Sequence, residues 1–232
     1  MTLQPNSSEF LSVFINYLAI HDQAGSQSLP PLNELSKTLN ISVATLREQL
    51  EVARVLGLVD VRPRKGIRKL PYKFTPAVRL SLAYSLACDH ASFEDFADLR
   101  KHIEEAYWHE AVGKLTTEDL SFLKSLVNKA WTKLNGKPVQ IPHNEHRQLH
   151  ITIYKKLDNE FVNGLLEAYW DAYETIGLNV YADLSYLQKV WQFHHEMVDA
   201  IVTKDFDLGY QKLIEHADLI NQRPLIKYYQ PE

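Results

Sequence analysis

The chain has 232 residues, of which 45% are hydrophobic and 23% charged, and its formal net charge is −4. This composition excludes wholesale disorder, and the length suits two domains better than one. No apolar run of about 18 residues occurs, which excludes a membrane-spanning helix. The single cysteine, Cys88, excludes an internal disulfide and fits a reducing compartment, and its apolar neighbours in "YSLAC" predict that it is buried. The N-terminus lacks the features of a secretory signal, so we expect a cytoplasmic protein.

Positive charge gathers in the first third of the chain. Residues 1–72 carry a net charge of +2 against −6 for the remainder, and residues 54–69 hold six basic side chains and one acidic. A local basic patch on an otherwise acidic molecule is typical of a DNA-binding module attached to a separate acidic body. A solvated charged loop would give the same count, so the charge alone leaves both interpretations open.

Three helices are predicted before the basic stretch. The apolar residues of "SEFLSVFINYLAI" recur at helical spacing and predict a helix over 8–21, with Ser7 or Ser8 as its N-cap. A short helix follows in "PLNELSKTLN". A longer helix follows in "SVATLREQLEVARVLG", where Ser42 is the expected N-cap and Gly57 the expected glycine just past the C-terminus.

The basic stretch itself predicts a β-hairpin. "LVDVRPRKGIRKL" alternates apolar residues on both sides of a basic turn. Helix, helix, tight turn, helix and basic hairpin is the order of a winged helix-turn-helix. In such a module the second helix of the pair can enter the major groove. The hairpin tip can then place Arg64 and Lys65 on phosphates or in the minor groove, and Gly66 lets the backbone turn tightly.

The remainder of the chain is predicted to be entirely helical. After the Pro-containing connector "LPYKFTP", the apolar periodicity is that of helices and no strand pattern of useful length occurs. We expect helices near 77–89, 92–114, 116–135, 142–157, 159–178, 183–204 and 206–221. The predicted fold class is therefore mainly α, with an N-terminal winged helix-turn-helix followed by an all-α bundle.

The sequence resembles the GntR superfamily of transcription regulators, in the FadR-like branch that carries an FCD domain. "LPPLNELSKTLNISVATLREQLEVARVLGLVDVRPRKGI" has the Leu-Pro step, the Arg-Glu-containing recognition helix, the Gly-Leu step and the glycine-tipped wing of that superfamily. The similarity continues through "DLRKHIE", "RQLHITIYKKLDNEFV", "HHEMVDAIVTKDFD" and "KLIEHADL". The resemblance implies a DNA-binding domain over 1–72, a linker over 73–78, and an FCD-type effector-binding and dimerisation domain over 79–232.

A family of this kind also implies partners and contact residues. We expect a homodimeric regulator, more often a repressor than an activator, that binds a pseudo-palindromic operator in double-stranded DNA. The expected DNA-contacting residues are Ser42, Thr45, Arg47, Arg64, Lys65 and Gly66. Two arginines that commonly contact DNA in the family are replaced here by Asn33 and Val43. Fewer cationic contacts predict weaker and less salt-sensitive binding, or a different operator.

A histidine-rich segment, "PHNEHRQLH", is the candidate metal site. His146 and His150 lie four residues apart, so on one helix they share a face and can bind one ion. The resemblance adds His194 and His216 at the spacings of the family's metal ligands, and puts His146 where the family has an aspartate. Imidazole ligands suit zinc, which we expect here, or nickel or copper rather than magnesium or calcium. Ordinary polar or surface histidines are the alternative.

The same cluster suggests the chemistry of an effector. Four neutral imidazoles would leave a divalent ion with its full charge of +2, which favours a small carboxylate. Arg100 matches a family arginine near the cavity and can bind a carboxylate in a bidentate manner, and Asn159 is a second effector-binding candidate. For Arg100, an ion pair with Glu104 one helical turn away is the alternative.

The sequence carries no catalytic motif that we can identify, and we expect no enzyme. The glutamate of "HNEHRQLH" has the wrong offset for an HExxH zinc protease, and no Gly-rich phosphate loop or nucleophile elbow occurs. Two alternatives to the regulator stay open. One is a winged-helix protein that works through protein contacts, which Asn33 and Val43 favour slightly. The other is a metal-dependent hydrolase built in the helical bundle.

Overall fold

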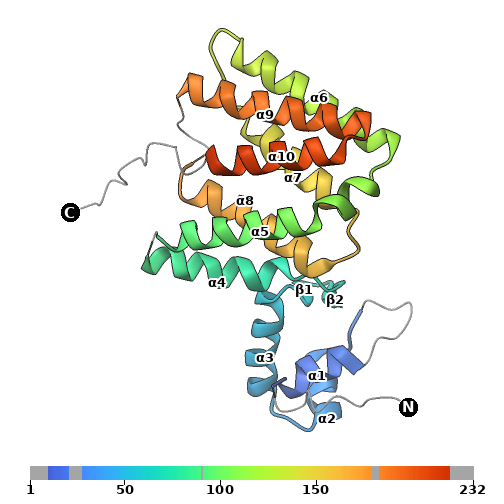
Figure 1. Ribbon diagram of the computed structural model, residues 1–232. Helices are drawn as coiled ribbons and strands as arrows, with labels where there is room; N and C mark the ends of the chain where they lie inside the picture. The colour runs from blue at the N-terminus through green and yellow to red at the C-terminus, as the bar shows by residue number, and fades with distance from the viewer. Residues whose placement is uncertain (1–9, 21–27, 90, 179–182, 220–232) are drawn as a thin grey trace, which may run out of the picture. The chain divides into compact units, whose positions relative to one another are not determined.

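We determined the fold from a computed structural model that describes residues 10–20, 28–89, 91–178 and 183–219. These residues form ten helices and one two-stranded hairpin, so the predicted mainly α fold is confirmed (Figure 1). The chain separates into two compact units, Met1–Leu80 and Ser81–Glu232, which we describe in turn. In the part of the chain that is described, no helix is long and apolar enough to cross a membrane.

The first unit has the predicted order of three helices and a hairpin. Its elements are α1 (Val13–Ile20), α2 (Leu32–Leu39), α3 (Val43–Val55), β1 (Val59–Arg62) and β2 (Gly66–Lys69). Their apolar faces meet in one small core, in which Phe14, Leu35 and Leu46 are fully buried. Burial of these side chains fixes how the helix pair and the hairpin are held together within the unit.

Both ends of α3 are set by the expected residues. The Ser42 hydroxyl accepts a hydrogen bond from the backbone N–H of Thr45 at 3.0 Å, which makes Ser42 the N-cap. Gly57 follows the helix with φ of +70°, and a Cβ atom at this position would lie 2.8 Å from Cγ of Pro76. Glycine is therefore required at position 57 both by the backbone conformation and by the available space.

The hairpin is closed by a short turn of unusual conformation. Val59 pairs with Lys69 and Arg62 with Gly66, which leaves three residues in the turn. Gly66 has a φ of +80°, as expected for the residue that lets the chain reverse, but Arg64 also lies in the left-handed region at +64°. Arg64 therefore carries some backbone strain, because residues other than glycine are uncommon at positive φ.

The first helix begins later than predicted. It starts at Val13 rather than near residue 8, because the Ser12 hydroxyl accepts a hydrogen bond from the N–H of Ile15 at 3.4 Å and acts as the cap. Phe10, which the apolar spacing places on the buried face of the predicted helix, is 91% exposed. The expected N-cap residues, 7 and 8, lie outside the described part of the chain.

The second unit is the predicted helical bundle. Its helices, with α4 at the boundary of the two units, are α4 (Thr75–Cys88), α5 (Ser92–Gly113), α6 (Thr117–Leu134), α7 (His143–Tyr154), α8 (Glu160–Thr175), α9 (Leu184–Thr203) and α10 (Phe206–Ala217). α7 packs against α5, α6 and α8, while α9 packs against α6 and α10 (Figure 1). The central helix α7 is therefore enclosed by other helices of the unit.

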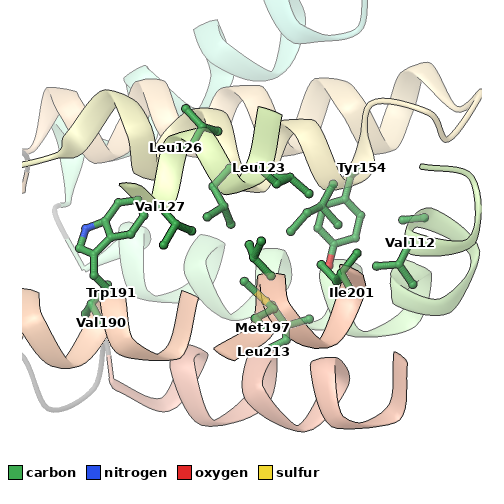
Figure 2. Packing of buried hydrophobic residues seen from close by; sticks show 14 of the residues in the cluster. Val112, Leu123, Leu126, Val127, Tyr154, Val190, Trp191, Met197, Ile201 and Leu213 are labelled. Carbon is green, nitrogen blue, oxygen red and sulfur yellow. The ribbon is translucent and has the colours of Figure 1, made fainter. Parts of the chain in front are cut away.

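One large apolar core runs through the bundle. It includes Leu123 and Val127 of α6, Trp191 and Met197 of α9, and Leu213 of α10 (Figure 2). A core of this size holds the helices in register, so side chains on facing helices have defined positions. A site assembled from several helices requires such defined side-chain positions.

The structure differs from expectation at two points of α4. The predicted linker 73–78 is helical from Thr75 onward, because Pro76 falls in the first turn, where proline is well tolerated. Cys88 is exposed rather than buried. Leu82 and Leu86 form the buried face of α4, and Cys88 lies two residues, or about 200° around the helix, beyond Leu86.

The N-terminus of α6 gives a test of stability against pH. Thr116 and Asp119 form a capping box, and Lys155 Nζ lies 2.7 Å from Asp119 Oδ1. Burial alone would raise the pKa of Asp119, but the hydrogen bonds from Lys155 and Thr116 outweigh it and lower the pKa to about 2. An ionised Asp119 thus stabilises the fold above its unfolded pKa of about 4, and this stabilisation is lost as the pH falls towards 2.

We therefore expect Asp119→Asn to lower the free energy of unfolding by about 1–2 kcal/mol at pH 7. The difference from wild type should shrink between about pH 4 and pH 2. Urea unfolding across this pH range measures it, with Asp158→Asn, an exposed carboxylate, as the control. A difference that stays constant down to pH 2 would contradict the assigned role of the charge.

Candidate metal centre and nucleic-acid contacts

Four histidines from three helices meet inside the second unit. His146 and His150 stand one turn apart on α7, His194 comes from the middle of α9, and His216 from the last turn of α10. Each offers a ring nitrogen, and these nitrogens all lie within 4.8 Å of one another. The structure thus brings together all four residues that the sequence suggested as metal ligands.

The four rings are packed closely. Nε2 of His150 lies 3.1 Å from Nε2 of His194. The ring centroids of His194 and His216 are 4.2 Å apart, and those of His146 and His194 are 4.6 Å apart. Four nitrogens bound tetrahedrally to one zinc at about 2.0–2.1 Å would stand roughly 3.4 Å from each other. Small adjustments of these side chains therefore suffice for them to share one ion.

The cluster is shielded from water. His150, His194 and His216 are buried and His146 is half-buried. Burial, reinforced by repulsion from neighbouring charges, holds the pKa of His146, His194 and His216 well below the usual value of a histidine. The rings are therefore neutral at physiological pH, which is the form in which imidazole binds a metal.

Several ring nitrogens of the cluster are unsatisfied. Within the described part of the chain, Nε2 of His146, Nδ1 of His194 and Nδ1 of His216 have no hydrogen-bond partner. Leaving a buried polar atom without a partner costs about 1–3 kcal/mol. A set of neutral, buried and partly unsatisfied imidazoles fits a transition metal of the zinc or nickel type.

Aromatic side chains form the walls of the cluster. The Trp170 ring of α8 lies 4.7 Å from the His146 ring, and the Trp191 ring of α9 lies 4.8 Å from the His194 ring, between centroids. Both tryptophans are fully buried. Their indoles restrict how the imidazoles can rotate and exclude water from two sides.

A buried ion pair lies directly behind His150. Arg100 and Glu104, one turn apart on α5, are 9% and 2% exposed, and Arg100 Nη2 lies 2.9 Å from Glu104 Oε2. Glu104 Oε1 lies 3.0 Å from His150 Nδ1. Cζ of Arg100 also stacks 4.5 Å above the Tyr169 ring.

This pair keeps both of its charges although it is buried. Burial would raise the pKa of Glu104, but the neighbouring Arg100 and His150 outweigh it and lower that pKa. Burial would likewise lower the pKa of Arg100, but the Glu104 carboxylate outweighs it and raises that pKa. The sequence indicates only the spacing of Glu104 from Arg100 and gives no signal for its interaction with His150.

His143, His195 and Asn159 have positions outside the cluster. His143 Nε2 is 2.8 Å from a carboxylate oxygen of Glu174, and His195, exposed beside buried His194, pairs with Asp199 at 3.2 Å. Asn159 is the N-cap of α8, where its side-chain oxygen accepts hydrogen bonds from the next backbone N–H groups. Its amide donates to the Tyr107 hydroxyl at 3.4 Å.

In the first unit, the candidate DNA-contacting side chains are split between helix and hairpin. Arg47 of α3 and Arg64, Lys65 and Gly66 of the hairpin tip are exposed. None of these three cations forms an ion pair with another described residue. Ser42 and Thr45 share the N-cap of α3, with their hydroxyl oxygens 2.9 Å apart.

Other cations of the same stretch are partly neutralised. Arg54 Nε donates to Glu51 at 2.8 Å, and Arg62 pairs with Asp60 at 2.6 Å. Arg47 and the hairpin tip therefore keep positive charge that no acid among the described residues pairs with. A helix-turn-helix presents its positive charge to phosphates in this way.

Comparisons with known proteins agree with this architecture. The FCD domain family matches residues 95–219, more than half of the chain. The chain is 22% identical over 204 residues to the Uxu operon transcriptional regulator of Escherichia coli (strain K12), covering 86% of this chain and 79% of that protein. Its fold is similar to a solved structure of Streptococcus agalactiae GntR, with a TM-score of 0.67 and 18% identity over 90% of this chain and 95% of that one. The chain belongs to the FCD-domain family.

Proposed function

We propose that this regulator binds an operator in double-stranded DNA as a homodimer in the cytoplasm, and that a small carboxylate bound at its histidine cluster changes its DNA affinity. The observation that carries the proposal is a four-histidine cluster in the same chain as a helix-turn-helix whose hairpin-tip cations form no ion pair with the described residues. Residues 1–72 would form the DNA-binding domain, and residues 79–232 the domain for effector binding and dimerisation. Repression is the mode of control that we propose.

The metal, zinc in our proposal with nickel as the second choice, would be held by His146, His150, His194 and His216. When bound, it would supply a charge of +2 in a site whose protein ligands are all neutral. The nearby Arg100 and Glu104 charges cancel each other. A single uncompensated positive centre in a dry site favours a ligand with one anionic group.

The carboxylate would bind at the histidine cluster, as an additional ligand of the ion beside the four imidazoles, rather than at Arg100. The guanidinium already meets Glu104 and the Tyr169 ring, so an effector carboxylate would have to displace a buried ion pair. Asn159 would contribute by capping α8, the helix that carries Trp170, rather than by direct contact. At the DNA, Arg47, Arg64 and Lys65 would contact phosphates or bases, with Gly66 allowing close approach and Ser42 and Thr45 ordering the helix N-terminus.

Selection of DNA from a random duplex pool by the zinc-loaded protein tests this function. We expect enrichment of duplexes with two half-sites related by two-fold symmetry. At least one member of a panel of small carboxylates should then change the affinity for the selected duplex by about 5- to 150-fold, and only in metal-loaded protein. Failure to enrich any sequence would contradict the DNA-binding function. Enrichment without any carboxylate effect would contradict the proposed effector.

A further inference from the structure

The buried carboxylate of Glu104 connects α5 to the candidate metal centre. One oxygen, Oε2, lies 2.9 Å from Arg100 Nη2, and the other, Oε1, lies 3.0 Å from His150 Nδ1. The backbone carbonyl of the same residue accepts a hydrogen bond from the Tyr154 hydroxyl at 2.9 Å. Glu104 is thereby fixed at its backbone and at both carboxylate oxygens, and its Oε1 can accept a hydrogen bond from a protonated Nδ1 of His150, whereas the guanidinium of Arg100 can only donate.

Two neighbours compete for Nδ1 of His150. Arg100 Nη2 lies 2.8 Å from this nitrogen, and Glu104 Oε1 lies 3.0 Å from it. A neutral imidazole carries one proton, so Nδ1 can donate to Glu104 or accept from Arg100, but not both. In the first tautomer Nε2 has a free lone pair, which faces His194 at 3.1 Å. In the second tautomer Nε2 carries the proton and cannot bind a metal.

We propose that Glu104 is the positioning residue of the metal centre, holding His150 in the tautomer whose Nε2 lone pair faces the other three histidines. This inference rests on the proposed metal centre. Arg100 supports it by binding the second carboxylate oxygen and keeping the carboxylate in place. A carboxylate that accepts the outer N–H of a ligand histidine fixes its ring orientation and raises its basicity.

The amide Glu104→Gln separates this role from simple packing, since it keeps the shape and removes the charge. The amide oxygen of the variant can accept a hydrogen bond from Arg100 or from His150. When it accepts from Arg100, the amide N–H group faces His150 Nδ1 and favours the tautomer with the proton on Nε2. We expect zinc affinity, measured by competition with a chelating indicator on the full-length chain, to fall about 10- to 100-fold. The control is Asp119→Asn, which removes another buried carboxylate, one that pairs with Lys155 and not with a histidine of the cluster. This variant should bind zinc as wild type does.

A second measurement reads the tautomer of His150 directly. ¹⁵N NMR of histidine in the metal-free wild type reports which ring nitrogen carries the proton, with the His150 signals assigned by their loss in His150→Asn. We expect the proton on Nδ1 in the wild type and on Nε2 in Glu104→Gln. A wild type with the proton on Nε2 would overturn the inference, as would zinc affinity in Glu104→Gln within twofold of wild type. If the wild type itself binds no zinc, the proposed metal centre falls together with this inference.

Discussion

Replacing His194 with alanine is expected to remove most of the stabilisation that zinc gives this protein. Structural zinc sites contribute about 10–16 kcal/mol through four ligands, so loss of one ligand should weaken binding about 100-fold or more. At free zinc of about 1,000 times the wild-type Kd, binding stabilises the wild type by about 4 kcal/mol, but a 100-fold weaker site by only about 1.4 kcal/mol. For a chain of this length, the rise in melting temperature on zinc addition should fall from about 12 °C to about 4 °C.

The adjacent residue provides a matched control. His195 has the same side chain on the same helix, but it is exposed and paired with Asp199. His195→Ala should therefore keep the full zinc-dependent rise. Melting of each metal-free variant separates any change in packing from the loss of a ligand. An equal loss in both variants, or a wild type whose melting temperature zinc does not change, would contradict the four-histidine site.

The histidine cluster shows how far the sequence could lead. To predict that His146 and His150 lie together, it was enough that their segment be helical, because a spacing of four residues puts both on one face. The 100° step between neighbours in a helix explains why His194 and His195 face different directions. The meeting of α7, α9 and α10 could not be derived from periodicity, since it depends on which helices pack together. The family resemblance supplied that part.

Other features depend on tertiary contacts that spacing does not encode. Arg100 and Glu104 were visible as a one-turn pair, but the sequence could not place His150 against the second oxygen of Glu104, 46 residues away. The burial predicted for Cys88 was wrong because the composition of the neighbouring residues does not carry their helical phase. The late start of α1 reflects Ser12, a capping residue inside an otherwise apolar stretch.

The sequence gives an incomplete account of the charge available in the candidate DNA-binding region. The count of six basic residues within 54–69 indicated a DNA-binding patch, yet Arg54 and Arg62 are tied to neighbouring acids. Where the chain reverses, Arg64 and Lys65 have no paired acid among the described residues. Binding to phosphates should therefore depend on these two side chains more than the local net charge suggests.

Replacing Arg64 and Lys65 together with alanine is expected to weaken DNA binding by about 50- to 100-fold for each chain at 0.1 M salt. For every phosphate that the variant no longer neutralises, the slope of log K against log salt should also become shallower by about 0.9. Alanine has a Cβ atom as arginine does, so the positive φ of Arg64 is no more strained in the variant. Fluorescence anisotropy with a selected duplex between 50 and 200 mM salt measures both effects. Lys124→Ala with Lys129→Ala removes the same charge from the exposed face of α6 and should leave the slope unchanged. Equal effects of the two double variants would mean that net charge, rather than the hairpin tip, governs binding.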